Sequence, residues 1–423
     1  MKNAIAALAL LAAALLPAAL RAEEPPLRAG DGGGGFGHLT LMDGVRLRLT
    51  GYVDAGFFGT QGDGTAYVRD AGKLLHPEYQ GVVPWVFLGD PWGNPINSQG
   101  DSADLGLDRT NVPRFDPIQS GGHPSFLVNM VNLGLAASFG ESFFFESSIG
   151  FEPRQGLLGS SGDQFDVDLA YLEWVPFKAV DLHVFAGKFE STFGIEYRTR
   201  KAPDNFGITP SLISRYTEGE LTGLKVRGAF FDQRLTVNLA VSNGGTFTEK
   251  FAHFFNEIDL NGGKTVSGRV SLLLPLPITA EIGASGEIGA QDEQRSDATV
   301  QWLAGADLRV TVRDLTFKGE ILRGHADGGG IDQAARLHVT GWYGELQYQL
   351  LPWLGLLGRV DRRKADLLAF PNLYLTDLLR FTAGVRFDIS WNLIAKLEYL
   401  HLVEVTGPEI PDDVFTSSII FRF

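Results

Sequence analysis

The chain contains no cysteine and only 3 methionines among its 423 residues. The lack of cysteine excludes disulfides, thiolate zinc sites, iron–sulfur clusters and cysteine nucleophiles. Basic residues are fewer than acidic ones. The chain has 36 Lys and Arg and 50 Asp and Glu, which gives a formal net charge of −14. That acidic balance argues against a general nucleic-acid binder, whose binding surface is basic.

After Glu23 the chain lacks any apolar run long enough to cross a bilayer as a helix. One shorter apolar run comes earlier, since Lys2 begins a short positive region and residues 5–20 are almost entirely Ala and Leu. Because the small residue Ala22 precedes Glu23, we predict a secretory signal peptide over residues 1–22, with a membrane-anchor helix as the alternative. An exported chain without membrane helices is either a soluble protein or an outer-membrane β-barrel.

Glycine and phenylalanine are abundant by contrast, with 52 and 30 residues. Residues 23–44 are rich in Gly and Pro, and we predict that they form a flexible periplasmic lead-in. From there onward, apolar and polar residues alternate. In the first such segment Val45 and Leu47 alternate with Arg46 and Arg48. A period of two indicates strands that have one apolar face.

The alternation predicts about sixteen strands over the rest of the chain. They are residues 45–58, 124–139, 142–153, 165–176, 181–197, 219–231, 234–243, 264–275, 277–291, 297–312, 315–326, 336–351, 354–366, 378–390, 393–406 and 412–423. Short connections alternate with longer ones, as periplasmic turns and extracellular loops do in transmembrane barrels. We therefore predict an all-β fold, an antiparallel up-and-down transmembrane barrel over residues 45–423, with 59–123 as a long extracellular loop.

A soluble β-sandwich or propeller is the alternative, but it has no use for apolar outer faces on every strand. In a barrel the polar faces line a water-filled lumen. The lumen charges predicted from this parity include Lys188, Glu190, Glu196, Arg359, Asp361, Arg363, Arg380, Arg386 and Asp388. Basic and acidic groups are balanced along this wall, so most are expected to pair across strands. An anion-preferring patch made by the four arginines of this set is the sharper alternative.

The chain ends in alternating hydrophobic residues, with Phe421 and Phe423 on one face of the last predicted strand. This ending resembles the closing strand of bacterial outer-membrane proteins. The resemblance implies recognition by the barrel-assembly machinery.

Several short motifs resemble the OmpL-like β-barrel porins, the porin-2 group. The longest is residues 187–197, with the sequence GKFESTFGIEY, followed by APDN at residues 202–205. Shorter matches lie at residues 51–55, 170–173 and 242–244, so the resemblance covers about half of the chain. It implies a passive channel. The long loop 59–123 departs from simpler members of the group.

The connection between the fifth and sixth predicted strands is the candidate pore constriction. Sixteen-stranded porins, which the strand count resembles, fold this loop into the lumen. Residues 198–218 hold a set of mixed charges: Arg198, Arg200, Lys201, Asp204, Arg215 and Glu218. Such a set would create a transverse electric field across a pore. The alternative is a loop that lies over the mouth with its charges solvated.

We therefore predict an outer-membrane porin, a passive diffusion channel for small hydrophilic solutes or ions, with both termini in the periplasm. A plugged or adhesive barrel is the first alternative. A barrel-embedded lipid hydrolase is the second, and it is disfavoured because the chain has no Gly-x-Ser-x-Gly motif and its eight His are scattered.

We expect no enzyme activity, no cofactor and no metal. The acidic residues Asp101, Asp104, Asp108 and Asp116 fit no cation-binding loop template. The expected partners are outer-membrane lipids and lipopolysaccharide, the barrel-assembly machinery and, by analogy with sixteen-stranded porins, two further copies of the chain in a homotrimer.

Overall fold

The computed structural model describes twelve segments of the chain. They are residues 38–42, 44–61, 94–101, 123–153, 165–177, 180–244, 259, 261–290, 299–327, 336–367, 374–405 and 412–423. The predicted signal peptide, most of the lead-in, most of the loop 59–123 and the acidic residues Asp104, Asp108 and Asp116 lie outside these described residues. Within the described segments, no helix has the length and apolar character needed to cross a membrane.

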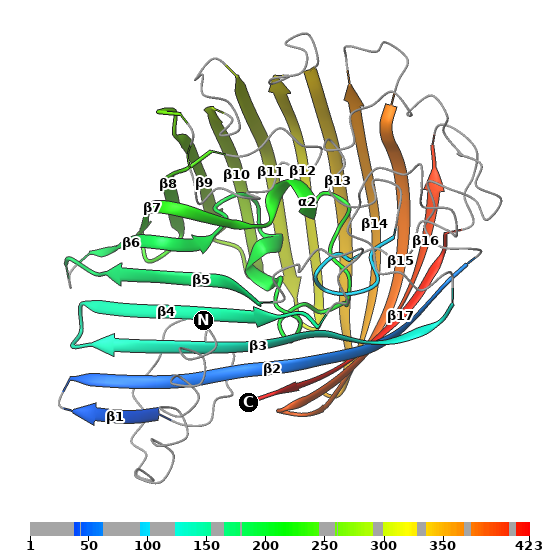
Figure 1. Cartoon of the computed structure of the whole chain (residues 1–423), viewed down its shortest axis with the longest axis horizontal. Helices are drawn as coiled ribbons and strands as arrows, with labels where there is room; N and C mark the ends of the chain where they lie inside the picture. Colours follow the sequence, from blue (N-terminus) through cyan, green and yellow to red (C-terminus); the bar gives the residue numbers. More distant parts are fainter. Residues whose placement is uncertain are drawn as a thin grey trace.

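Sixteen strands form one closed antiparallel barrel (Figure 1). They are β2 (Val45–Thr60), β3 (Ser125–Phe139), β4 (Phe143–Phe151), β5 (Phe165–Trp174), β6 (Asp181–Glu190), β7 (Glu220–Phe230), β8 (Leu235–Ser242), β9 (Thr265–Leu273), β10 (Thr279–Ala290), β11 (Val300–Val312), β12 (Leu315–Asp327), β13 (Arg336–Leu351), β14 (Leu354–Leu367), β15 (Tyr374–Ser390), β16 (Leu393–Glu404) and β17 (Val414–Arg422). Each strand pairs with the next, and β17 pairs with β2 to close the ring. The predicted fold class and strand number are confirmed.

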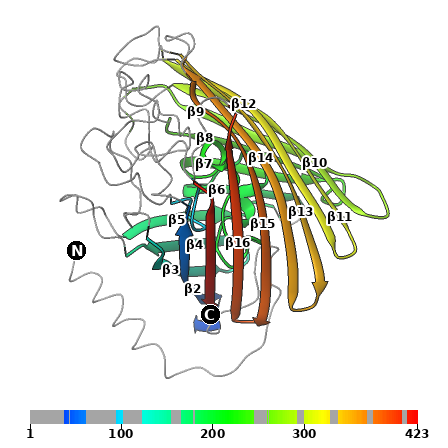
Figure 2. The same cartoon turned by 90° about the vertical axis from the view of Figure 1, so that its right-hand side faces the viewer.

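The connections sort by edge, as the sequence predicts. The short connections are residues 140–142, 175–180, 231–234, 274–278, 313–314, 352–353 and 391–392. The other edge carries the connections 61–124, 152–164, 191–219, 243–264, 291–299, 328–335, 368–373 and 405–413. The chain end lies at the edge of the short connections (Figure 2). There the backbone N–H of Arg422 donates a hydrogen bond to Asn392 O (2.9 Å).

The outer wall of the barrel is apolar. Large hydrophobic side chains such as Leu224, Ile321 and Ile419 are 57–59 % exposed to the surroundings. Residues next to them in sequence point inward, and polar ones such as Glu320 and Ser418 are buried there. This reverses the pattern of a soluble sheet, because lipid replaces water outside the barrel.

A short additional strand, β1 (His38–Met42), precedes the barrel and pairs with the start of β2. It lies within residues 23–44, so this part of the predicted flexible lead-in is instead a strand. The chain after β17 stays paired with β2 as far as Gly51, which exchanges two backbone hydrogen bonds with Phe423 (2.9 and 3.0 Å). β1 pairs with residues 45–48, just beyond this point. The edge of β2 that β17 leaves free is thus covered by β1.

The largest difference from the predicted strand boundaries is at the end of β6. The fifth predicted strand ran to residue 197, but β6 ends at Glu190. Residues 191–195 leave the wall and are buried inside the barrel. Glu196 is therefore not a wall residue, as its parity suggested, but the first residue of η4 (Glu196–Thr199) in the following connection.

Candidate functional site in the barrel lumen

The connection between β6 and β7 folds into the barrel, and we call residues 191–219 the lumen loop (Figure 1). It contains η4 and the short helix α2 (Ser214–Thr217). Most of its residues are buried against inward-facing side chains of the wall. The alternative of a loop lying over the mouth is wrong for these residues.

Gly194 allows the chain to turn inward. Its φ is +70°, a value that L side chains rarely adopt. A Cβ atom at this position would also collide with the carboxylate of Glu320 on β12. That carboxylate accepts hydrogen bonds from the backbone N–H groups of Ile195 (3.0 Å) and Glu196 (2.7 Å). The close approach of the loop backbone to the wall therefore requires glycine.

The middle of the lumen loop is held by two side chains of β16. Lys396 Nζ donates to the carbonyl oxygens of Ala202 (2.6 Å), Asn205 (2.5 Å) and Gly207 (2.8 Å). Glu398 accepts from the next amides, Ile208 N (2.6 Å) and Thr209 N (3.0 Å), and from the Thr209 hydroxyl (2.7 Å). One cation thus satisfies carbonyls and one anion satisfies amides along a single stretch of loop.

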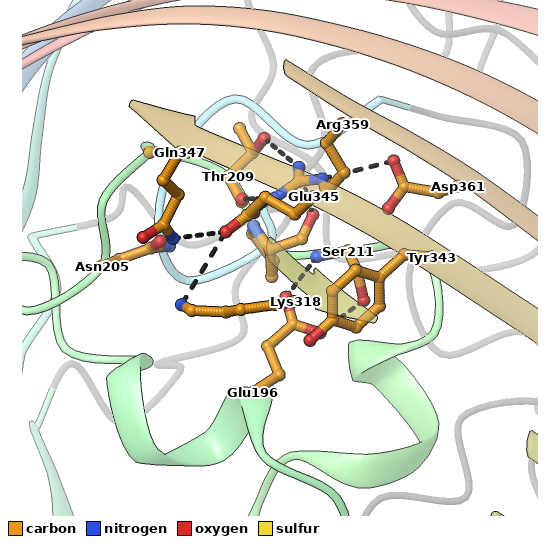
Figure 3. Close-up of polar contacts among 12 residues, drawn as sticks. Glu196, Asn205, Thr209, Ser211, Lys318, Tyr343, Glu345, Gln347, Arg359 and Asp361 are labelled. Atoms are coloured by element: carbon orange, nitrogen blue, oxygen red, sulfur yellow. Dashed lines mark hydrogen bonds and ion pairs between the residues drawn. The ribbon is translucent and has the colours of Figure 1, made fainter. Parts of the chain in front are cut away.

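Two arginines of the neighbouring strands bind the same stretch, and Figure 3 shows one of them, Arg359, beside Thr209 and Asp361. Arg359 donates to Thr209 O (2.9 Å) and Pro210 O (3.0 Å), and Arg380 donates to Pro210 O (2.6 Å). Both also pair with Asp361, at 3.2 Å each. With side chains at most 1 % exposed, they cannot form the open anion-preferring patch that was the sharper alternative. They anchor the loop instead.

The basic part of the lumen loop faces carboxylates on three other strands. Arg198 pairs with Glu281 on β10 at 3.2 Å, and Lys201 lies 3.9 Å from Glu146 on β4. Arg200 forms an ion pair with Glu220, the first residue of β7. Between 17 % and 39 % of each of these side chains remains exposed, so this is where charged groups of the loop and the wall both reach solvent inside the barrel.

The remaining predicted loop residues have different surroundings. Asp204 is exposed, whereas Arg215 in α2 and Glu218 at the loop end are half-buried. Burial, with the nearby carboxylate of Glu196, raises the pKa of Glu218 well above its usual range. Burial also raises the pKa of Glu196, against the opposing effect of Arg359 and the hydrogen bond from Ser211. The base of the loop therefore concentrates acidic groups that are costly to ionise.

The other predicted lumen charges lie at several positions around the barrel wall. Lys188 lies 3.5 Å from Asp166 on β5, and Arg386 pairs with Asp388 at 2.9 Å while donating to Pro203 O and Asn205 O. Glu190 is the last residue of β6, where the lumen loop begins. Arg363 is buried on the inner face of β14.

A second segment inside the barrel was missed by the sequence analysis. We call residues 94–101 the inner segment. Ile96 packs in a cluster with Phe58, Leu400 and Val414 of the wall. Asn94 Nδ2 donates to Asp412 O (3.0 Å), and Thr416 donates to the Ile96 carbonyl.

A single asparagine shapes this inner segment. Asn97 Oδ1 accepts from the backbone of Gln99 (3.1 Å) and Asp101 (3.2 Å), while its Nδ2 donates to Asp101 Oδ2 (2.8 Å) and Asn129 Oδ1 (3.2 Å). The segment also reaches the lumen loop, since a Cβ atom at Gly100 would lie 3.7 Å from Pro210 Cγ. A short, Asn-rich turn between Gly- and Pro-rich stretches gives no periodic signal, so only the packing identifies it.

The predicted assembly signal occupies the closing strand. Phe421 is 44 % exposed on the outer wall, and its ring centroid lies 6.4 Å from that of Phe423. Among the described residues, no group of three or more His, Asp or Glu side chains is arranged to hold a metal ion.

A model of one protein family, described as "Putative beta-barrel porin-2, OmpL-like", matches residues 117–423. No curated protein matches the sequence significantly.

Several solved structures share the fold. The chain is similar to the outer membrane channel DcaP of Acinetobacter baumannii, with a TM-score of 0.58, 10 % identity, and coverage of 91 % of this chain and 99 % of that one. It is similar to Salmonella typhi OmpF in complex with daunomycin, with a TM-score of 0.56, 10 % identity, and coverage of 91 % and 100 %. It is also similar to the trimer form of OmpT of Vibrio cholerae, with a TM-score of 0.52, 10 % identity, and coverage of 90 % and 100 %.

Proposed function

The chain belongs to the OmpL-like beta-barrel porin-2 family, and from this premise we propose that it is an outer-membrane diffusion channel for small hydrophilic solutes and ions. A closed barrel with an apolar outer wall and a polar inner wall suits this role, because lipid stays outside and water inside. The observation that carries the proposal is the lumen loop, which brings partly exposed charges into the middle of the barrel.

The constriction in this proposal lies beside the partly exposed ion pairs that join the basic part of the lumen loop to the acidic wall. Arg198, Arg200 and Lys201 provide positive charge, and Glu146, Glu220 and Glu281 provide negative charge. Ion pairs that remain partly exposed present charges of both signs to the water beside them, and their local field orients polar solutes. Near-equal numbers of the two signs favour weak ion selectivity.

Solute uptake into liposomes tests this proposal. Proteoliposomes should swell in isosmotic solutions of small neutral sugars, faster for pentoses than for hexoses. Replacing Lys201 and Glu146 together by Ala removes an ion pair, 3.9 Å between its charged atoms, that lines the proposed passage. We expect this double variant to reduce the difference between pentoses and hexoses. Lys264→Ala, which removes a cation paired with Asp259 outside the lumen loop, should leave it unchanged.

A plugged barrel is the second candidate, and the inner segment is the observation that favours it. This segment and the lumen loop both occupy the barrel and contact each other near Pro210. If they close the lumen, the wild-type protein will be silent in the swelling assay. Asn97→Ala, which removes four hydrogen bonds that shape the inner segment, would then start solute uptake. The matched variant Asn392→Ala, in an exposed turn, would not.

The cellular setting is proposed on the same basis. We place the barrel in the bacterial outer membrane, with the short connections and both termini on the periplasmic side and the long connections outside. A homotrimer is proposed because the trimer form of OmpT shares the fold. Phe421 and Phe423 are proposed to be read by the assembly machinery. A porin of this kind is not an enzyme.

A further inference from the structure

Charged side chains gather on the outer wall of three adjacent strands, although most of this wall is apolar. Ile321 on β12 and Trp342 on β13 are 58 % and 39 % exposed on this wall, and they pair across the two strands. Arg362 on β14 pairs with Trp342 and therefore faces the same side. Ile321, Trp342 and Arg362 thus form a row across the three strands. Beyond this row, toward the edge of the long connections, every second residue of each strand also points outward.

The strand register places the outward residues in successive rows (Figure 1 shows the three strands side by side). The row beyond Trp342 is Arg323–Thr340–Lys364, the next is His325–His338–Asp366, and the last is Asp327–Arg336. The first two rows beyond Trp342 contain no apolar residue. We call Arg323, Arg336, Thr340, Arg362 and Lys364 the outer cationic patch.

The cations of the patch are unequally neutralised. Arg362 pairs with the buried Asp377 at 3.3 Å, and Lys364 pairs with Asp366 at 3.2 Å. Arg336 lies 3.9 Å from Asp327 with 59 % of its side chain exposed. Arg323 is exposed and makes no hydrogen bond or ion pair with another residue that the structure describes. Four cations thus face three carboxylates, and the two arginines with the weakest partners are the most accessible.

Exposed Arg and Lys side chains on the outer wall are tolerated only near the membrane interface. An Arg or Lys on the lipid side costs about 2–4 kcal/mol at the bilayer midplane and about 0–1 kcal/mol near the interface. The apolar residues Phe317, Ile321 and Trp342 lie on the side of the patch that leads toward the middle of the wall. The patch therefore lies at the level of the lipid headgroups, and a tryptophan marks the boundary with the acyl chains.

We propose that the outer cationic patch binds the phosphate groups of a lipid headgroup in the leaflet at the long-loop edge. Arginine suits this ligand because its planar guanidinium donates two parallel hydrogen bonds to phosphate oxygens. Arg323 and the hydroxyl of Thr340 beside it hold one phosphate, Arg336, two rows nearer the edge, holds a second, and Lys364 adds charge next to Thr340. The proposal rests on the orientation given under Proposed function, but it does not depend on whether the lumen conducts.

Native mass spectrometry of the purified full-length barrel tests the proposal, with bisphosphorylated lipid A as the probe. The test variant is Arg323→Gln with Arg336→Gln. The matched control is Arg234→Gln with Arg313→Gln, which removes the same charge from two exposed positions in turns at the opposite edge. We expect the test variant to bind lipid A at least about tenfold more weakly than the wild type, and the control to bind as the wild type does.

Two further arms identify the ligand. Lipid A from which both phosphates have been removed should bind the wild type and the test variant equally weakly. Millimolar inorganic phosphate should not displace the bisphosphorylated lipid, since the acyl chains hold it against the wall. Displacement by free phosphate would overturn the assignment to a lipid.

The remaining outcomes contradict the proposal. Equal lipid A affinity in all three proteins would refute it. If the test variant instead changed oligomeric state with unaltered lipid affinity, the patch would be a contact between copies of the chain. Unheated electrophoretic mobility checks that each variant is folded, and solute uptake by the test variant should equal that of the wild type. If the channel proposal fails, the wild type will take up no solute, but its lipid binding will be unaffected.

Discussion

Lys396 and Glu398 stand two residues apart on the inner face of β16, and together they satisfy six polar atoms of the lumen loop. Both alternate with the apolar Leu397, so their parity places them in the lumen, where a balanced wall predicts that they pair with other wall residues. Their partners are instead backbone groups more than 180 residues away. Residue parity predicts the direction of a side chain, but only the folded loop determines what it contacts.

Replacing Lys396 by Met should destabilise the barrel. Three buried carbonyl oxygens would lose their donor, and the nearby anion Glu398 would lose a neighbouring cation, so the free energy of unfolding should fall by about 3 kcal/mol. Urea titration in detergent micelles, followed by tryptophan fluorescence, measures this. Lys264→Met, which removes an exposed cation, should cost less than about 1 kcal/mol. Equal effects of the two substitutions would contradict the anchoring role.

Glu218 at the base of the lumen loop should make stability depend on pH. Burial and the neighbouring Glu196 raise its pKa, so the folded protein holds this proton more tightly than the unfolded chain. Stability is then complete below the ordinary pKa near 4.5 and declines as pH rises above it. Glu218→Gln should therefore unfold at a higher temperature than the wild type at pH 8 and at a similar temperature at pH 4. An equal difference at both pH values would refute this.

At the scale of elements, the strands could be predicted to within a few residues, because lipid requires an apolar residue at every second position of each one. The end of β6 is the exception. Phe193, Ile195 and Tyr197 continue the alternation of β6 beyond its end, but they belong to the lumen loop. An apolar residue packed inside the barrel looks the same in sequence as one that faces lipid. The inner segment could not be predicted, since its eight residues have no period and their neighbours come from strands far along the chain.

Gly194 is the position where the lumen loop depends most on one residue. Gly194→Ala should cost about 1–2 kcal/mol for the left-handed backbone and about 1–3 kcal/mol more for the clash with Glu320. Gly140→Ala is the matched control, because Gly140 has a φ of +64° and open space around its Cβ position. It should show the backbone cost alone. Urea titration of both variants measures the difference, and equal costs would mean that Gly194 does not approach Glu320 closely.

At the scale of the whole molecule, the closed barrel accounts for both the absence of cysteine and the need for glycine. A closed ring of sixteen strands leaves no long open edge, so it needs no covalent link between elements. Its lumen takes in two chain segments, and glycine is required where the backbone of one of them turns inward. Charge is also unevenly distributed over the barrel. The outer wall is mostly apolar and carries a patch of cations near one edge, whereas the charges inside are balanced.

The central claim is that the lumen conducts despite the two segments inside it. Single-channel recording in a planar lipid bilayer under a salt gradient tests this most directly. The proposed mixed-charge constriction predicts discrete conductance steps with a reversal potential close to zero, because neither ion is strongly preferred. A folded barrel that inserts and stays silent, but conducts once Asn97 is replaced by Ala, would contradict the claim and make the protein a plugged barrel.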